Sequence, residues 1–211
     1  MSSELDARQA LDVGGATLLV EPVEGAECPL GDRERVVLAG LRHPLSRSDW
    51  LSGRRVAKHV LLVRFGIPPD RSEVLPDAAG RPVVHAGGAP RPELRLSISH
   101  SGPWAAAACG RVGLGVDLCT LGDGARLRRI APRVFSRGEA AAVGAFRSEE
   151  RSAAAWAVKE ACLKATGGGI FRPGTRSIRL LSAVPPRLEQ TDLSARAWNL
   201  PGAVLALALE A

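Results

Sequence analysis

The segment W-A-V-K-E-A-C-L-K-A-T-G-G-G, at residues 156–169, combines a carboxylate and an ammonium group at helical spacing. Glu160 and Lys164 lie one turn apart, on the helix face that also carries Trp156. A Glu four residues before a Lys stabilises an exposed helix by roughly 0.2–0.5 kcal/mol. A left-handed C-cap explains Gly167, and packing in the core explains the tryptophan. Taken alone, the segment therefore predicts a capped helix and no chemistry.

Three other patterns contain residue types used in phosphate and metal chemistry. Asp117 lies in G-V-D-L-C, His100 in S-I-S-H-S-G and Arg81 in G-R-P. Carboxylate oxygens are the ligands that Mg²⁺ prefers, and the planar fork of arginine suits phosphate. Each pattern also has an ordinary explanation. G-R-P and the aspartate can form turns, and a histidine after a strand is commonly a hydrogen-bonded loop residue.

The first half of the chain predicts helices followed by strands. Residues 31–41 and 48–66 have helical patterns, and Ser48 and Gly66 are the expected N-cap and C-cap of the second helix. The Pro- and Gly-rich residues 67–93 indicate turns and short strands such as R-P-V-V. Strands are then expected at 94–99, 104–110 and 112–118.

The second half repeats this order. Ser136 and Glu139 form a predicted capping box at the start of one of its helices. Helices are expected at 125–135, 136–146 and 151–167, and strands at 176–184, 194–200 and 202–210. The repeated order predicts an α+β fold made of two similar halves.

Composition limits the class of protein. The 211 residues suffice for one large domain or two smaller ones, and 28 Lys and Arg against 22 Asp and Glu give a net charge of +6, which favours anionic partners. Aromatic residues make up 4% of the chain and are not interleaved with a basic run, which argues against binding of single-stranded nucleic acid. The four cysteines contain no C-x-x-C pair, so neither a zinc site nor a disulfide framework is expected. No apolar run reaches membrane-spanning length, and the N-terminus does not resemble a secretory signal, so we expect a cytoplasmic protein.

Together the patterns resemble the 4′-phosphopantetheinyl transferases, specifically the larger, pseudodimeric type associated with surfactin and enterobactin synthesis. They follow the family's order and spacing over roughly residues 30–175, and G-V-D and W-x-x-K-E-A-x-x-K-A-x-G are its most specific signatures. The resemblance implies two α/β halves related by pseudo-twofold symmetry, residues 1–111 and 112–211, with coenzyme A and Mg²⁺ in the cleft between them. The family transfers the phosphopantetheine arm of coenzyme A to a serine of an apo acyl or peptidyl carrier protein, and releases 3′,5′-ADP.

The resemblance also implies roles in the second half. Asp117 and Glu160 match the family's ligands for Mg²⁺, with Mn²⁺ as an alternative, and Lys164 matches a lysine that binds the coenzyme A diphosphate. Glu139 matches a glutamate near the attacking hydroxyl, where it would be a general base, but the capping box explains it equally well. The implied catalytic residues are Glu160, Lys164, Asp117 and Glu139.

Coenzyme A carries a 3′-phosphate and a diphosphate, so its site needs cations. Arg54 and Lys58 share a helix face and match basic residues of the family, whereas a solvated basic face, which would include Arg55, is the alternative. The coenzyme A-binding residues that the resemblance implies are Arg54, Lys58, Arg81, Pro82, Ser99, His100 and Lys164.

One position departs from the family pattern. Many relatives have a second carboxylate two residues after the aspartate of G-V-D, on the same strand face, where this chain has Cys119. A thiol is a poor ligand for Mg²⁺, so we expect two protein carboxylates on the metal and an active enzyme.

Two other classes of function compete with the transferase. A non-catalytic homologue that binds coenzyme A or a carrier protein is supported by Cys119, and a nucleic-acid-binding module is supported by net charge alone. The presence of Asp117, Glu160 and Lys164 favours the enzyme. We expect a monomer whose partners are coenzyme A and an acidic carrier protein, with no nucleic acid or membrane partner.

Overall fold

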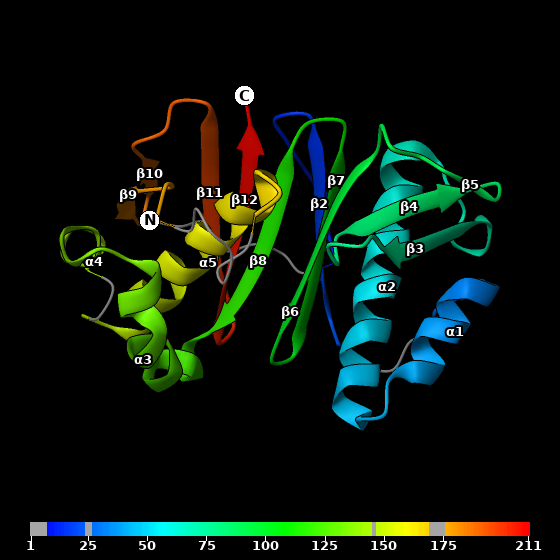
Figure 1. The fold of residues 1–211 in the computed structure, drawn as a ribbon, viewed down its shortest axis with the longest axis horizontal. Helices are drawn as coiled ribbons and strands as arrows, with labels where there is room; N and C mark the ends of the chain where they lie inside the picture. The colour runs from blue at the N-terminus through cyan, green and yellow to red at the C-terminus, as the bar shows by residue number, and fades with distance from the viewer. Residues whose placement is uncertain (1–7, 24–26, 145–146, 169–175) are drawn as a thin grey trace. The chain divides into compact units, whose positions relative to one another are not determined.

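A computed structural model describes residues 8–23, 27–144, 147–168 and 176–211, and the chain divides into two compact units (Figure 1). The N-terminal unit ends at Val112, and the C-terminal unit continues from Gly113 to Ala211. Each combines helices with antiparallel strands, so the mixed α/β class predicted from the sequence is confirmed. Within the described ranges, no helix is long and apolar enough to cross a membrane.

The N-terminal unit is built on an antiparallel sheet with strand order β1-β2-β7-β6. Its strands are β1 (Leu11–Val13), β2 (Ala16–Pro22), β7 (Trp104–Gly110) and β6 (Arg95–Ser101). The long helix α2 (Pro44–Phe65) packs on this sheet, because the alanines of β7 leave room for its buried valines and leucines. The remaining elements are α1 (Asp32–Gly40), a 3₁₀ turn η1 (Pro69–Arg71), and a small sheet of β3 (Ser72–Pro76), β4 (Pro82–Ala86) and β5 (Ala89–Pro90).

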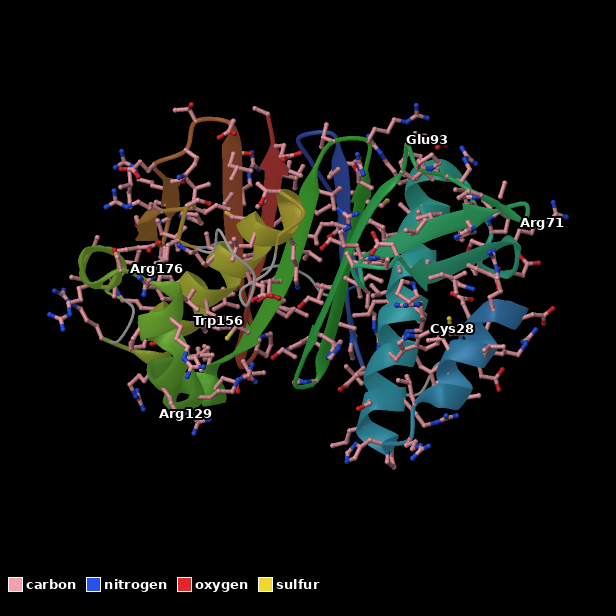
Figure 2. The ribbon with its side chains drawn as sticks, viewed as in Figure 1. Cys28, Arg71, Glu93, Arg129, Trp156 and Arg176 are labelled. Carbon is pink, nitrogen blue, oxygen red and sulfur yellow. The ribbon has the colours of Figure 1, made fainter. Side chains whose placement is uncertain are left out.

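The C-terminal unit repeats this plan with the strand order β11-β12-β8. Its sheet contains β8 (Leu114–Thr120), β11 (Leu193–Leu200) and β12 (Ala203–Glu210), and helix α5 (Glu149–Ala165) packs on it. The other elements are a 3₁₀ turn η2 (Leu121–Asp123), α3 (Gly124–Val134), α4 (Arg137–Val143), β9 (Leu180–Ala183) and β10 (Pro186–Leu188). Trp156, labelled in Figure 2, is 7% exposed and lies in the core of this unit, as expected.

Most of the predicted elements are confirmed, including the capping box of Ser136 and Glu139 and the left-handed C-cap at Gly66. The predicted N-cap at Ser48 is wrong. Helix α2 begins at Pro44, because proline at the first helical position has a fitting φ and no N–H to satisfy, and the Ser48 carbonyl instead accepts a bond from the Ser52 hydroxyl. The hairpin of β1 and β2 was not predicted.

Helix α5 makes a very close approach to β8 at Gly115. A Cβ atom on Gly115 would lie 2.0 Å from the carbonyl oxygen of Ala161 and 2.6 Å from the backbone nitrogen of Ala165. Both are backbone atoms, which cannot rotate away. The glycine of G-V-D therefore sets the distance between helix and strand two residues before Asp117.

We expect Gly115→Ala to destabilise the protein by about 1–3 kcal/mol, because α5 must move away from β8 to admit the methyl group. The measurement is the thermal midpoint by differential scanning calorimetry. Gly138→Ala in α4 is the matched control, since its Cβ would meet nothing within 4 Å and alanine favours a helix. Equal midpoints for the two variants would contradict the close contact.

Candidate functional site

Asp117 and Lys164 meet where α5 crosses β8. The Lys164 ammonium lies 2.8 Å from Asp117 Oδ1 and donates to the carbonyl oxygen of Val116 at 3.0 Å. The Asp117 side chain is 8% exposed and that of Lys164 is 26% exposed, so the pair is shielded but open on the lysine side. A strand and a helix 47 residues apart in sequence thus bring together two of the predicted catalytic residues.

Glu160 belongs to the same site. Burial, and next the negative charge of Asp117, raise the pKa of its carboxyl from 4.5 to about 7, whereas Lys164 and Arg126 oppose the shift. Glu160 also lies one helical turn before Lys164, which is ion-paired with Asp117. Two carboxylates then share one close cation, and the Glu160 charge is incompletely compensated.

Such a site suits a divalent cation. Both acidic groups offer hard oxygen ligands, and added positive charge would stabilise the ionised form of Glu160. In the described part of the chain there is no group of three or more His, Cys, Asp and Glu side chains that could hold a metal ion. Further ligands would therefore come from water or from substrate phosphates, which is the usual coordination of Mg²⁺.

Cys119 does not complete this ligand set. Its side chain lies in the core at 3% exposure, with Sγ 3.7 Å from the carbonyl oxygen of Thr120. Burial, then the charges of Asp117 and Asp123, raise the pKa of the thiol to about 12. Because the thiolate is the form that binds metals, Cys119 is an inert core residue in this environment.

Glu139 does not lie at an accessible catalytic position. Its side chain is 2% exposed, and Oε1 accepts hydrogen bonds from Lys159 Nζ at 2.8 Å and from the backbone N–H of Leu180 at 2.9 Å. A carboxylate enclosed by two donors cannot reach a hydroxyl of a separate protein. The predicted capping box of Glu139 is thus present, and this buried geometry favours it over the general-base role.

Lys58 is likewise enclosed by partners within its own unit. Its side chain is 1% exposed, and Nζ donates to Glu34 Oε2 at 2.6 Å and to the carbonyl oxygens of Pro29 and Pro69. The three hydrogens of the ammonium group are all used, so none is left for a coenzyme A phosphate. The alternative of a solvated basic face is wrong, because Lys58 and Arg54 are both buried.

Arg54 of α2 keeps a buried donor without a hydrogen-bond partner in the described part of the chain. Its guanidinium lies 4.4 Å from the ring centroid of Trp50, and the residue is 8% exposed. Among the described residues, Arg54 Nε is one of the few buried side-chain polar atoms without a hydrogen-bond partner. A buried, unsatisfied cationic donor held by an aromatic ring is suited to an anion.

Arg54 lines a cavity of about 330 Å³ in the N-terminal unit. Pro82 and His100 line the same cavity, and His100 Nδ1 lies 3.7 Å from Asp49 Oδ2. Arg81 is not among the lining residues, because its side chain pairs with Asp77 at 2.8 Å, and Ser99 is buried in β6. The structure therefore gathers Arg54, Pro82 and His100 of the predicted set.

Lys159 and Glu34 are the charged residues that the sequence analysis missed. Each forms the buried partner of a residue that was singled out, Glu139 and Lys58 respectively. The signal was present in the Lys of W-x-x-K-E-A and in the Glu three residues after Gly31, the N-cap of α1. The burial of these residues could not be recognised from the sequence. Charged residues are rarely buried without a partner, and here the partner is distant in sequence.

The pKa of Glu160 predicts a dependence of stability on pH. Because the folded state holds this proton more tightly than the unfolded chain, the stability that the group contributes is present below pH 4.5 and is lost as the pH rises through about 7. We expect the thermal midpoint of the metal-free protein to fall relative to that of Glu160→Gln across this interval. Millimolar Mg²⁺ should reduce the difference. Glu150→Gln, at an exposed position of the same helix, should follow the wild type. Parallel curves for wild type and Glu160→Gln would contradict the assignment.

Comparison with known proteins agrees with this geometry. Residues 113–208 match the model of the 4′-phosphopantetheinyl transferase superfamily. The chain is 33% identical to the 4′-phosphopantetheinyl transferase AcpT of Salmonella typhimurium over 166 residues, 77% of this chain and 81% of that protein. It is 28% identical to the 4′-phosphopantetheinyl transferase HetI of Nostoc over 161 residues, 74% of this chain and 66% of that protein.

A solved structure was also matched, that of a holo-(acyl-carrier-protein) synthase from Bacillus anthracis in complex with CoA (3′,5′-ADP). It is 24% identical, has a TM-score of 0.38, and is covered over 92% of its length by 45% of this chain. The similarity to AcpT over most of both chains, together with the family match that includes Asp117, Glu160 and Lys164, shows that this chain belongs to the 4′-phosphopantetheinyl transferase superfamily.

Proposed function

We propose that this protein transfers the 4′-phosphopantetheine group of coenzyme A to a serine of an apo acyl or peptidyl carrier protein, with Mg²⁺ or Mn²⁺ as cofactor, and releases 3′,5′-ADP. The observation that carries the proposal is the cluster of Asp117, Glu160 and Lys164 at the contact of α5 with β8. Two carboxylates and one lysine provide the metal ligands and the cation that transfer of a phosphate-linked group requires.

In this mechanism Asp117 and Glu160 would hold the metal ion, which neutralises charge on the diphosphate of coenzyme A when bound. Lys164 would leave Asp117 and donate to a diphosphate oxygen, where its charge offsets the negative charge that develops on the leaving phosphate. Its 26% exposure makes such a movement feasible. Glu139 has no role in proton transfer in this mechanism, because its hydrogen bonds from Lys159 and from the N–H of Leu180 would first have to be broken.

In the N-terminal unit, Arg54 would bind a phosphate of coenzyme A. The stacking on Trp50 fixes the guanidinium before the ligand arrives, so little side-chain entropy is lost on binding. Pro82 would contact the ligand as part of the wall, and His100, with a side chain 49% exposed, would add a hydrogen-bond donor at the cavity mouth. Arg81 would reach the ligand only after leaving Asp77.

Helix α3 supports an acidic carrier protein as the acceptor. Leu127, Ala131 and Val134 are buried in the core, so the opposite face of the helix is solvated. That face carries exposed arginines at positions 126, 128, 129 and 133. Together with the net charge of +6, this local excess of positive charge would speed the encounter with an acidic partner.

The proposal includes the larger, pseudodimeric type of enzyme. Residues 1–111 would bind the coenzyme A phosphates, and residues 112–211 would hold the metal and the catalytic groups. The support is internal, because each unit packs one long helix on an antiparallel sheet and uses a buried Glu–Lys pair. A chain that carries both halves would act as a monomer, and we expect it in the cytoplasm with its carrier proteins.

The test is the intact mass of purified apo carrier proteins after incubation with the protein, coenzyme A and Mg²⁺. We expect a gain of one phosphopantetheine group and a fall in rate of about 10²-fold or more for Glu160→Gln, which removes a metal ligand. Glu149→Gln, at an exposed position of the same helix, is the matched control and should act as wild type. Binding of coenzyme A without modification of fatty-acid, polyketide or peptidyl carriers would favour the non-catalytic alternative.

A separate prediction concerns the cavity of the N-terminal unit. Arg54→Gln should weaken coenzyme A binding about tenfold, because a charge-assisted hydrogen bond to phosphate is lost. Isothermal titration calorimetry measures this, and Arg71→Gln, which removes an exposed arginine of the same unit, is the control. Unchanged affinity in Arg54→Gln would exclude this cavity as a phosphate site.

A further inference from the structure

The C-terminal unit ties α5 to its neighbours through a buried ion pair. Glu139, in the first turn of α4, caps that helix at Ser136 and accepts from Lys159 Nζ at 2.8 Å and from the N–H of Leu180 at 2.9 Å. Lys159 also donates to the carbonyl oxygen of Ile178. One carboxylate and one ammonium group thus join α4, α5 and the start of β9.

The N-terminal unit contains the same arrangement. Glu34, in the first turn of α1, accepts from the N–H of Gly31 at 3.0 Å, from Lys58 Nζ at 2.6 Å and from the N–H of Val74 at 2.8 Å. Lys58 also donates to the carbonyl oxygen of Pro69. Here the pair joins α1, α2 and β3. We call each arrangement a Glu–Lys clamp: Glu34 with Lys58, and Glu139 with Lys159.

In each unit the residue after the clamp lysine belongs to the long helix that packs on the strand preceding the helices. In the N-terminal unit this residue is His59, whose Nδ1 lies 2.6 Å from Glu21 Oε1 at the end of β2. In the C-terminal unit it is Glu160, which lies one helical turn before Lys164, and the Lys164 ammonium lies 2.8 Å from Asp117 on β8. Neighbouring residues on a helix point about 100° apart, so fixing the lysine on one flank fixes the direction of the next side chain.

The clamp residues are among the most completely buried in the chain, with side chains between 0% and 2% exposed. A buried ion pair contributes little to stability compared with apolar side chains of the same size, because both charges lose their hydration. What such a pair supplies is a defined geometry, since each charged group tolerates few alternative positions once its partners are set.

We propose that the Glu139–Lys159 clamp is the positioning pair for Glu160, which holds α5 in the rotation that presents this carboxylate to the metal ion. The inference rests on the proposed function. While Lys164 is bound to Asp117, the opposite flank of α5 is also held. Once Lys164 turns to the substrate phosphates, the ion pair on that flank is gone, and the clamp remains to resist rotation of the helix.

The test compares two double variants of the full chain. Glu139→Gln with Lys159→Met removes both charges of one clamp at nearly constant volume, and Glu34→Gln with Lys58→Met does the same in the other. The second is a matched control, because it removes the same groups from the unit that does not contain Glu160. Thermal midpoints of both variants are measured first, so that a loss of folding is separated from a loss of positioning.

Mn²⁺ affinity, followed by electron paramagnetic resonance with coenzyme A at a saturating concentration for each variant, is the decisive readout. We expect Glu139→Gln/Lys159→Met to bind Mn²⁺ about 10- to 100-fold more weakly, the size of effect usual for loss of a group that orients a metal ligand. Its kcat should fall while KM for the carrier protein holds. The control pair should bind Mn²⁺ as wild type, even where its midpoint falls equally.

Equal Mn²⁺ affinities in the two double variants would overturn the proposal, whatever their thermal midpoints. A wild-type protein that binds Mn²⁺ but modifies no carrier protein would instead refute the proposed function, and the Mn²⁺ comparison would still decide the role of the clamp. If a double variant does not fold, Glu139→Asp and Glu34→Asp replace them. Each substitution keeps the charge but shortens the side chain by one methylene group, and only Glu139→Asp should weaken Mn²⁺ binding.

Discussion

The contact of α5 with β8 at Gly115 is the constraint on which the site depends. With no side chain at this position, the backbone of the helix comes close enough to the strand to exclude even a methyl group. Lys164 thereby reaches Asp117 at 2.8 Å, two residues further along the strand. The buried alanines of α5, which include Ala157 and Ala161, have small side chains and so keep the helix close to the sheet along the rest of the interface. The glycine of G-V-D thus permits this close contact, and the aspartate forms its ion pair with Lys164 there.

Charge balance at this contact supports the proposed binding of a cation by Asp117 and Glu160. Asp117 is ion-paired with Lys164, whereas burial, and next the charge of that aspartate, raise the pKa of Glu160 to about 7. A divalent ion reverses the preference by compensating both carboxylates. Cys119 contributes no further negative charge, because burial keeps its thiol protonated. The site therefore depends more on substrate oxygens for metal binding than one with a third carboxylate would.

Sequence analysis correctly predicted the features of the fold that depend on local sequence patterns. Helical and alternating periodicity placed most helices and strands, and the residues of G-V-D and K-E-A-x-x-K were placed correctly at one contact. It missed the hairpin of β1 and β2, although Gly14 and Gly15 form a two-residue turn between β-rich runs. It also treated Lys58 as a ligand-binding cation and Glu139 as a candidate base. Neither buried pair was predicted, because each residue is paired with another 20 or more positions away, and sequence spacing within a helix carries no information about such a partner.

The two units show how one scaffold yields different chemistry. Each has a Glu–Lys clamp, and the residue after its lysine belongs to the long helix that packs on the neighbouring strand. In the N-terminal unit that strand residue, Glu21, already accepts from His59 at 2.6 Å and from Arg55 at 3.1 Å, so its charge is neutralised within the protein. In the C-terminal unit Asp117 is ion-paired with Lys164, and the second carboxylate, Glu160, lies one helical turn before that lysine. A divalent ion would gain little beside Glu21 and much beside Asp117. The asymmetry in these few side chains, and not any difference in the scaffold, is the reason to propose the metal site in the C-terminal unit.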